Sequence, residues 1–303
     1  MSIFELTDDE RVIAETAAAF AAKRLAPHAL EWDHSKHFPT DVLRAAAELG
    51  MAAIYCGEDV GGSGLRRIDA VRIFEELAAA DPALASFISI HNMCAWMVDT
   101  YGNPEQRKTW VPRLASMQTI ASYCLTEPGA GSDASALRTK AVRDSDGWVL
   151  DGVKQFISGA GVSDVYLVMA RTGADGPKGI SAFLVEKGTP GLSFGPNEAK
   201  MGWNTQPTAQ VILEQVRVPA DALLGISTSG VSLNVNRALR RARDRKLMTI
   251  GFTGRDGGTM PALCDFVFVV PSWSVHRVQE VHTVLLHLLW DTVHVAQGEP
   301  DVL

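Results

Sequence analysis

The spacing of apolar residues divides this chain of 303 residues into three parts. Up to about residue 118, apolar positions recur roughly every three or four residues, which is the period of a helix with one buried face. Thr7 and Glu10 have the spacing of a capping box, and Pro39 and Gly50 are placed to open and close a further helix. Residues 1–118 are therefore predicted to form an all-α domain.

The second part, residues 119–225, consists of short β-branched runs. Its sequence includes "VYLVMARTG", "ISAFLVEKG" and "AQVILEQVRVP", and glycine, proline and aspartate separate these runs. Such spacing is typical of an antiparallel barrel or sandwich. We therefore expect an antiparallel β-domain in the middle of the chain.

The third part, residues 226–303, alternates strand and helix patterns. "LLGIST", "KLMTIGFTG" and "FVFVVP" predict strands, whereas "SLNVNRALRRARD" and "SVHRVQEVHTVLLHLLWDTVHVA" predict helices. Alternation of this kind indicates a parallel sheet with crossover helices. The chain as a whole is predicted to be a multi-domain α+β protein that ends in a partial α/β segment.

Composition and charge narrow the classes of partner. The net charge of −7 argues against long nucleic acid, and the basic residues within 237–246 are expected on the exposed face of a helix. No apolar run has membrane-spanning length, and the first residues lack the pattern of a secretory signal. The four cysteines form no C-x-x-C pair, which favours a reduced, cytoplasmic compartment over a disulfide framework or zinc site.

The segment "YCLTEPGAGSDASALRTKA", Tyr123–Ala141, carries the most specific chemistry. Thr126 offers a hydroxyl and a backbone N–H, and Gly131 permits a close approach of the backbone to a ligand. Further along, Phe156 offers an aromatic face and Ser158 a second hydroxyl. Together these groups suit a flat ligand that carries hydrogen-bonding groups at its edge.

This segment resembles the flavin-binding signature of acyl-CoA dehydrogenases, and the resemblance continues to about residue 225. "IHNMCAWM" and "GWNTQPT" are most similar to the branch that oxidises short branched-chain thioesters such as isobutyryl-CoA. The resemblance implies an oxidoreductase with FAD as cofactor, an acyl-CoA substrate, electron-transfer flavoprotein as partner, and assembly into a homo-oligomer. Ser132 is expected to contact both FAD and the acyl-CoA. The residues expected to contact FAD are Tyr123, Leu125, Thr126, Gly131, Ser132, Phe156, Ile157 and Ser158.

The same resemblance leaves the catalytic base unassigned. In the family, the base is a glutamate of a third, helical domain, which follows the segment that matches "VPADALLG". Nothing after Gly225 resembles that domain, so we expect dehydrogenation to be impaired and FAD to bind weakly. A non-catalytic module that binds flavin or acyl-CoA is an alternative.

Residues 226–303 instead resemble the C-terminal half of the sugar isomerase (SIS) domain of phosphoheptose isomerases, so the chain reads as a chimera. Hydroxyl groups before a helix N-terminus can hold a phosphate. The resemblance implies sugar-phosphate contacts at Ser227, Thr228, Ser229 and Ser232.

The SIS resemblance also implies zinc binding by Gln279 and His287, with His287 in proton transfer. Eight helical residues rise roughly 12 Å, and zinc takes about four ligands, so these two residues alone make a poor site. Sugar-phosphate binding or isomerisation is therefore kept as the alternative function, with zinc only in that case.

Overall fold

The computed structural model describes residues 6–144, 147–219, 222–244 and 248–296. The chain divides into two compact units, which are described separately. Unit 1 comprises Met1–Val142 and Val149–Val218, and unit 2 comprises Arg143–Trp148 and Pro219–Leu303. The residues before Gly225 were expected to close the middle domain, but they lie in strand β8 (Ala222–Ser227) of unit 2. Strand propensity suits either domain, and the hydrogen-bonding partner decides the assignment.

Unit 1 begins with the predicted helical domain, which is confirmed. The capping box is present: Thr7 Oγ1 accepts the Glu10 N–H at 3.2 Å, and Glu10 Oε2 accepts the Thr7 N–H at 2.9 Å. A π-helical turn, Ala21–Leu25, continues the first helix. The helices are α1 (Asp8–Phe20), α2 (Ala29–Ser35), α3 (Thr40–Glu48), α4 (Arg67–Ala80), α5 (Pro82–Tyr101) and α6 (Pro104–Ala115).

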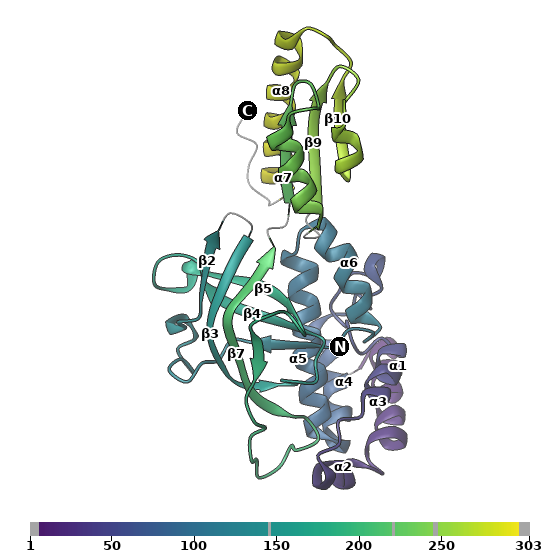
Figure 1. Ribbon diagram of the computed structural model, residues 1–303. Helices are drawn as coiled ribbons and strands as arrows, with labels where there is room; N and C mark the ends of the chain where they lie inside the picture. The colour runs from purple at the N-terminus through teal and green to yellow at the C-terminus, as the bar shows by residue number, and fades with distance from the viewer. Residues whose placement is uncertain (1–5, 145–146, 220–221, 245–247, 297–303) are drawn as a thin grey trace. The chain divides into compact units, whose positions relative to one another are not determined.

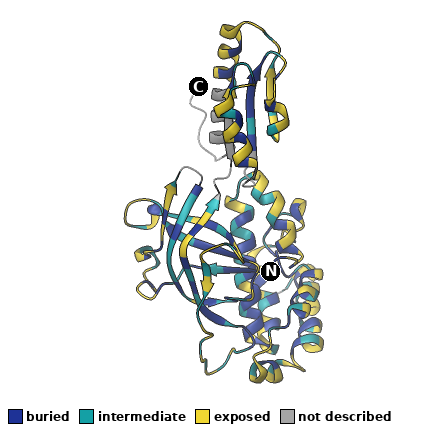
Figure 2. Cartoon of the chain, in the orientation of Figure 1, coloured by how far each residue is buried: buried dark blue, intermediate teal, exposed yellow. Residues whose placement is uncertain are grey.

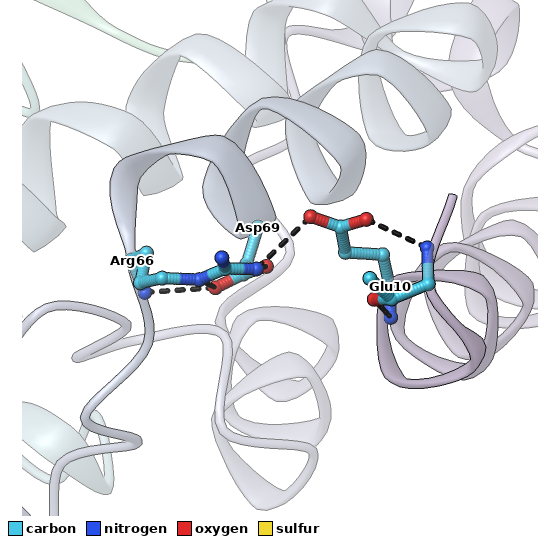
Figure 3. Close-up of polar contacts among 4 residues, drawn as sticks. Glu10, Arg66 and Asp69 are labelled. Atoms are coloured by element: carbon cyan, nitrogen blue, oxygen red, sulfur yellow. Dashed lines mark hydrogen bonds and ion pairs between the residues drawn. The ribbon is translucent and has the colours of Figure 1, made fainter. Parts of the chain in front are cut away.

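Arg66 connects the start of α1 to the start of α4 (Figure 3). Its Nη2 lies 2.9 Å from Glu10 Oε1 and 2.8 Å from Asp69 Oδ1. The hydrogen bond from Arg66 holds the pKa of Asp69 below its ordinary value. Because two-thirds of the Arg66 side chain is exposed, this network orients the two helices more than it stabilises them.

Helix α5 is the central helix of unit 1 and packs against α4, α6 and β1 (Ala121–Cys124) (Figure 1). Asp81 begins it by accepting the N–H groups of Ala83 and Leu84 at 2.9 and 3.1 Å. Buried residues occur along most of its length, including Phe87 and Val98 (Figure 2). A helix that is apolar on several sides must be covered on several sides, which α5 achieves by packing against both helices and a sheet.

The middle part of unit 1 is the expected β-domain, with a seven-stranded sheet in its described residues. The order is β1-β4-β2-β3-β7-β6, with β5 also paired to β4. β5 pairs antiparallel with β4, and β7 pairs antiparallel with β6, as expected. β1 and β2, however, each pair parallel with β4. Long connections permit these parallel pairs, so the sheet is mixed. The strands after β1 are β2 (Lys140–Asp144), β3 (Gly147–Ser158), β4 (Val165–Arg171), β5 (Ile180–Glu186), β6 (Leu192–Phe194) and β7 (Thr208–Pro219).

Unit 2 confirms the predicted parallel sheet, in the order β10-β9-β8. Met260–Leu263 forms a single 3-10 turn. The arginines at 237, 240, 241 and 243 are exposed, as predicted, and residues 245 and 246 lie outside the described part of the chain. No helix in the described part of the chain is long and apolar enough to cross a membrane. The remaining elements are α7 (Leu233–Asp244), β9 (Met248–Gly254), β10 (Phe266–Val270) and α8 (Val275–Ala296).

His91 joins three elements of unit 1 through a buried imidazole on α5. Its Nδ1 lies 3.1 Å from the Ala121 backbone nitrogen and must accept, because a backbone N–H can only donate. The proton is therefore on Nε2, which donates to the Leu114 carbonyl at 2.9 Å. Burial lowers the pKa of His91 from 6.5 to about 4. The neutral ring thus ties α5 to the end of α6 and to the first residue of β1.

The pKa of His91 predicts acid sensitivity of unit 1. Because the pKa is lower in the folded state than in the unfolded state, the contribution is complete above pH 6.5 and is lost as the pH falls towards about 4. A shift of this size corresponds to about 3 kcal/mol. We expect His91→Gln, which keeps a donor and an acceptor, to lose correspondingly less stability over this interval. Urea unfolding at several pH values measures the difference, and parallel pH profiles for the two proteins would contradict the assignment.

Candidate functional site

Two segments that are distant in the sequence meet at the ends of β1 and β3. The Gln155 backbone N–H donates to the Thr126 carbonyl at 2.8 Å. The Ser122 hydroxyl donates to the Ser158 carbonyl at 2.6 Å. These bonds lie on either side of Phe156 and place it beside the loop that follows β1. We call residues 123–132 and 156–158 the candidate flavin site.

Exposure separates the predicted FAD contacts into three groups. Gly131, Ser132 and Phe156 are exposed, so they are accessible to a ligand. The half-buried residues are Tyr123, Leu125, Thr126 and Ser158. Ile157 is only 2% exposed, so its side chain belongs to the core and its backbone is the part left to contact a ligand.

The glycines of the loop test whether a flat ligand fits the site. Glu127 and Ala130 exchange backbone hydrogen bonds of 3.0 and 3.1 Å, which makes the turn between them tight. A Cβ built on Gly129 or Gly131 would meet nothing within 4 Å, and neither glycine has a positive φ. Neither packing nor backbone conformation therefore requires glycine here. The open space above the loop suits the close approach of a ligand, and the residues present fit FAD.

Phe156 is held in a conformation that aromatic residues rarely adopt. Its φ is 58°, in the left-handed region, and its side chain is 62% exposed. Such a residue costs free energy and persists only where its surroundings impose it. The flanking bonds of Gln155, to the Thr126 carbonyl, and of Ser158 impose it here, and the ring is left exposed. An exposed, fixed aromatic face is what stacking on a flat cofactor requires.

A buried ion pair beneath the loop was not predicted from the sequence. Lys154 Nζ lies 2.7 Å from Glu127 Oε1, with the two side chains 0% and 7% exposed. Burial raises the pKa of Glu127, but the hydrogen bonds from Lys154 and from the backbone outweigh it, so the net pKa is lowered. Burial lowers the pKa of Lys154, and Glu127 opposes that shift. The sequence carries no clear signal for this burial, because Lys154 and Phe156 would face the same side of a regular strand, whereas only Lys154 is buried.

A second loop of unit 1 approaches the end of β3, and sequence reasoning assigned it no role. Gly159 donates its N–H to the Pro207 carbonyl at 2.8 Å. Lys200 Nζ donates to the Trp203 and Gln206 carbonyls at 2.6 and 2.7 Å, which fixes the backbone of this loop. Trp203 has a φ of 60° and is 49% exposed. Trp203 is thus a second exposed aromatic residue, and it precedes Pro207, which binds Gly159, by four residues.

The residues predicted from the SIS resemblance lie in unit 2. Ser227 shares a hydrogen bond of 2.8 Å with Ser232, and its hydroxyl also accepts the Gly230 N–H at 3.1 Å. Thr228 and Ser229 are half-buried, in the loop between β8 and α7. The hydroxyl of Ser227 therefore already has partners within the loop.

The zinc prediction is not tested. Gln279 is exposed on α8, and the side chain of His287 lies outside the described residues. Across the described ranges, no three His, Cys, Asp or Glu side chains are grouped so that they could hold a metal. All four cysteines are unpaired.

Comparison with known proteins identifies the two domains of unit 1. Residues 7–118 match the N-terminal domain of acyl-CoA dehydrogenases, and residues 122–216 match the middle domain. Over these residues, the chain belongs to the acyl-CoA dehydrogenase family. The candidate flavin site lies wholly within the acyl-CoA dehydrogenase middle domain, at residues 123–158.

Individual relatives support the same family. Over 232 residues the chain is 57% identical to the mitochondrial isobutyryl-CoA dehydrogenase of Dictyostelium discoideum, covering 76% of this chain and 56% of the relative. The Bos taurus protein of that name is 50% identical, with 74% and 54% covered. A glutaryl-CoA dehydrogenase of Mycobacterium smegmatis, solved with FADH2, gives a TM-score of 0.67 at 32% identity, with 71% and 55% covered. The chain spans about half the length of the curated relatives it matches.

Gly159 predicts a steric limit at the end of β3. Its φ is +80°, and an added Cβ would lie 2.5 to 2.7 Å from Ser122 Oγ, Ser163 Oγ and Phe87 Cε2. We expect Gly159→Ala to destabilise unit 1 by about 2 kcal/mol or more, because strain and overpacking add. Gly188→Ala is the matched control, since Gly188 has a φ of +87° with nothing nearby. Equal losses of stability in urea unfolding would show that crowding at Gly159 is unimportant.

Proposed function

We propose that this chain binds FAD and a short branched-chain acyl-CoA, such as isobutyryl-CoA, at the candidate flavin site. The observation that carries the proposal is the exposed ring of Phe156, which is held at positive φ next to the backbone bond between Gln155 and Thr126. The open space over Gly129 and Gly131 supports it, because the fold itself has no use for glycine there. The names and identities of the two isobutyryl-CoA dehydrogenases support the substrate class.

The proposed roles follow from exposure and hydrogen-bonding capacity. Thr126 and Ser158 would donate hydrogen bonds to the edge of the flavin ring, and Phe156 would cover one of its faces. Donors fixed before the reaction stabilise negative charge that develops on the ring. Gly131 and Ser132 would contact the cofactor from the exposed loop, with Ser132 also facing the thioester. When bound, FAD supplies hydride acceptance in the α,β-dehydrogenation of the substrate.

Further partners follow from family membership. Electron-transfer flavoprotein is the proposed electron acceptor, and a homo-oligomer is the proposed assembly. A cytoplasmic location is also proposed, and the four unpaired cysteines support a reducing compartment. The reaction also requires a carboxylate base within hydrogen-bond reach of the α-proton. We assign that role to no residue of this chain, so we propose that the chain by itself binds its ligands without turnover.

Sugar-phosphate binding by unit 2 is the second candidate. The observation that favours it is the loop Ser227–Ser232, which follows β8 of a parallel sheet and precedes the N-terminus of α7. Ligands of open α/β sheets bind at the carboxyl ends of parallel strands, and helix N-termini attract phosphate. Titration with sedoheptulose 7-phosphate, with Ser229→Ala as the variant, tests this candidate independently of the flavin.

Replacement of Phe156 separates flavin binding from stability. Phe156→Gly should raise the stability of the apoprotein by about 1 kcal/mol, because it relieves the positive φ of a largely exposed residue. It should weaken FAD binding by about tenfold, which is the range of a lost stacking contact. Lys36→Gly is the matched control, since Lys36 has a φ of 55° directly after α2, outside the candidate site. Flavin fluorescence titration and urea unfolding measure the two effects, and unchanged affinity in Phe156→Gly would refute the stacking role.

Turnover by the chain alone tests directly whether any of its residues acts as the catalytic base. With FAD in excess, we expect no measurable reduction of an artificial electron acceptor by isobutyryl-CoA. General-base catalysis typically contributes about a hundred- to ten-thousand-fold, so its loss is decisive. Flavin-dependent reduction would contradict this expectation. Substituting each carboxylate beyond residue 225 by its amide would then locate the base.

A further inference from the structure

We propose that the buried pair Lys154–Glu127 positions both segments of the candidate flavin site. This inference rests on the proposed flavin binding and adds two positioning residues to it. Neither side chain can touch a ligand, because the two are 0% and 7% exposed. Their effect on the cofactor must therefore pass through the backbone that they hold.

Lys154 binds the flavin loop at two points. Its Nζ donates to Glu127 Oε1 at 2.7 Å and to the Leu125 carbonyl at 3.1 Å. Leu125 and Glu127 flank Thr126, so a single ammonium group fixes the chain on both sides of the proposed hydrogen-bond donor. Between these contacts, the Thr126 carbonyl is held by the Gln155 N–H.

Glu127 extends the connection to the far end of the same loop. Its carboxylate accepts the Arg138 N–H at 2.6 Å through Oε2 and the Thr139 N–H at 2.9 Å through Oε1. The residues between Glu127 and Arg138 include the exposed Gly131 and Ser132. One carboxylate thus closes the loop that carries them, and Lys154 anchors that closed loop to β3.

The position of Lys154 in β3 couples this loop to the aromatic face. Phe156 follows Lys154 by two residues, and Gln155 between them makes the bond to Thr126. Movement of Lys154 would therefore displace Thr126 and Phe156 together. The pair sets the distance between the proposed edge donor and the proposed stacking face.

A contribution to the stability of the fold would not by itself explain why this buried ion pair is present. Burying two charges costs desolvation, and replacing a whole buried pair by uncharged groups often leaves stability unchanged. Removing one partner is different, because it leaves the other charge buried and uncompensated. The double variant Lys154→Met/Glu127→Gln therefore tests positioning with the least damage to folding. The glutamine oxygen can still accept from a backbone N–H.

The experiment compares wild type, the double variant and Lys154→Arg, with Leu213→Ala as a control. Leu213 is 2% exposed on β7, so its truncation destabilises the β-domain without removing a hydrogen bond to the flavin loop. We expect FAD affinity in the double variant to fall at least about tenfold. The absorption bands of the bound flavin should also be less well resolved than in wild type. Lys154→Arg should restore part of the affinity, because it keeps the charge. Leu213→Ala should lower the unfolding midpoint without a comparable loss of affinity.

Hydrogen exchange in the apoprotein supplies a readout that does not depend on flavin. Amides of residues 125–139 should exchange faster in the double variant than in wild type, while those of β4 should not. Wild-type affinity together with unchanged exchange in the double variant would overturn the positioning role. Loss of affinity no greater than in Leu213→Ala at equal stability would also overturn it. If wild type itself fails to bind FAD, the proposed function is refuted. The exchange data do not depend on flavin, so they still test whether the pair holds the loop.

Discussion

The structure of unit 1 depends on how the first residue of β1 is held. His91 accepts the Ala121 N–H from within α5, so the strand that leaves the helical domain begins at a fixed point. The strand then pairs in parallel with β4, and its second residue, Ser122, reaches the end of β3. The loop that carries Thr126 starts directly after β1. The helical domain therefore determines where the candidate flavin site can form.

Local signals in the sequence predicted the local structure well. The capping box at Thr7 and Glu10 and the change of apolar period after about residue 118 both depend on neighbouring residues, and both were found. The parallel pairing of β1 with β4 was missed, because it depends on a contact between strands about forty residues apart. The division before Pro219 was missed because strand propensity does not reveal which sheet a strand joins.

The candidate site shows the same division between local and distant information. Its loop could be recognised from glycines and hydroxyl residues that are close in the sequence. The positive φ of Phe156 and the burial of Lys154 could not, because both arise where β3 meets that loop. A lysine in a strand usually reads as a solvent-facing residue, and only the carboxylate of Glu127 makes its burial tolerable. Positioning residues of this kind become visible when the fold supplies their partners.

Gly129 and Gly131 bear on how this protein can change over generations. Selection for folding alone does not act on these two positions, because an added Cβ would meet nothing within 4 Å. Alleles that carry alanine at either position would give normal amounts of folded protein and pass unnoticed by quality control in the cell. They would be removed only where the loop is still in use. Natural variation at these two glycines is therefore a record of whether the lineage has kept its ligand.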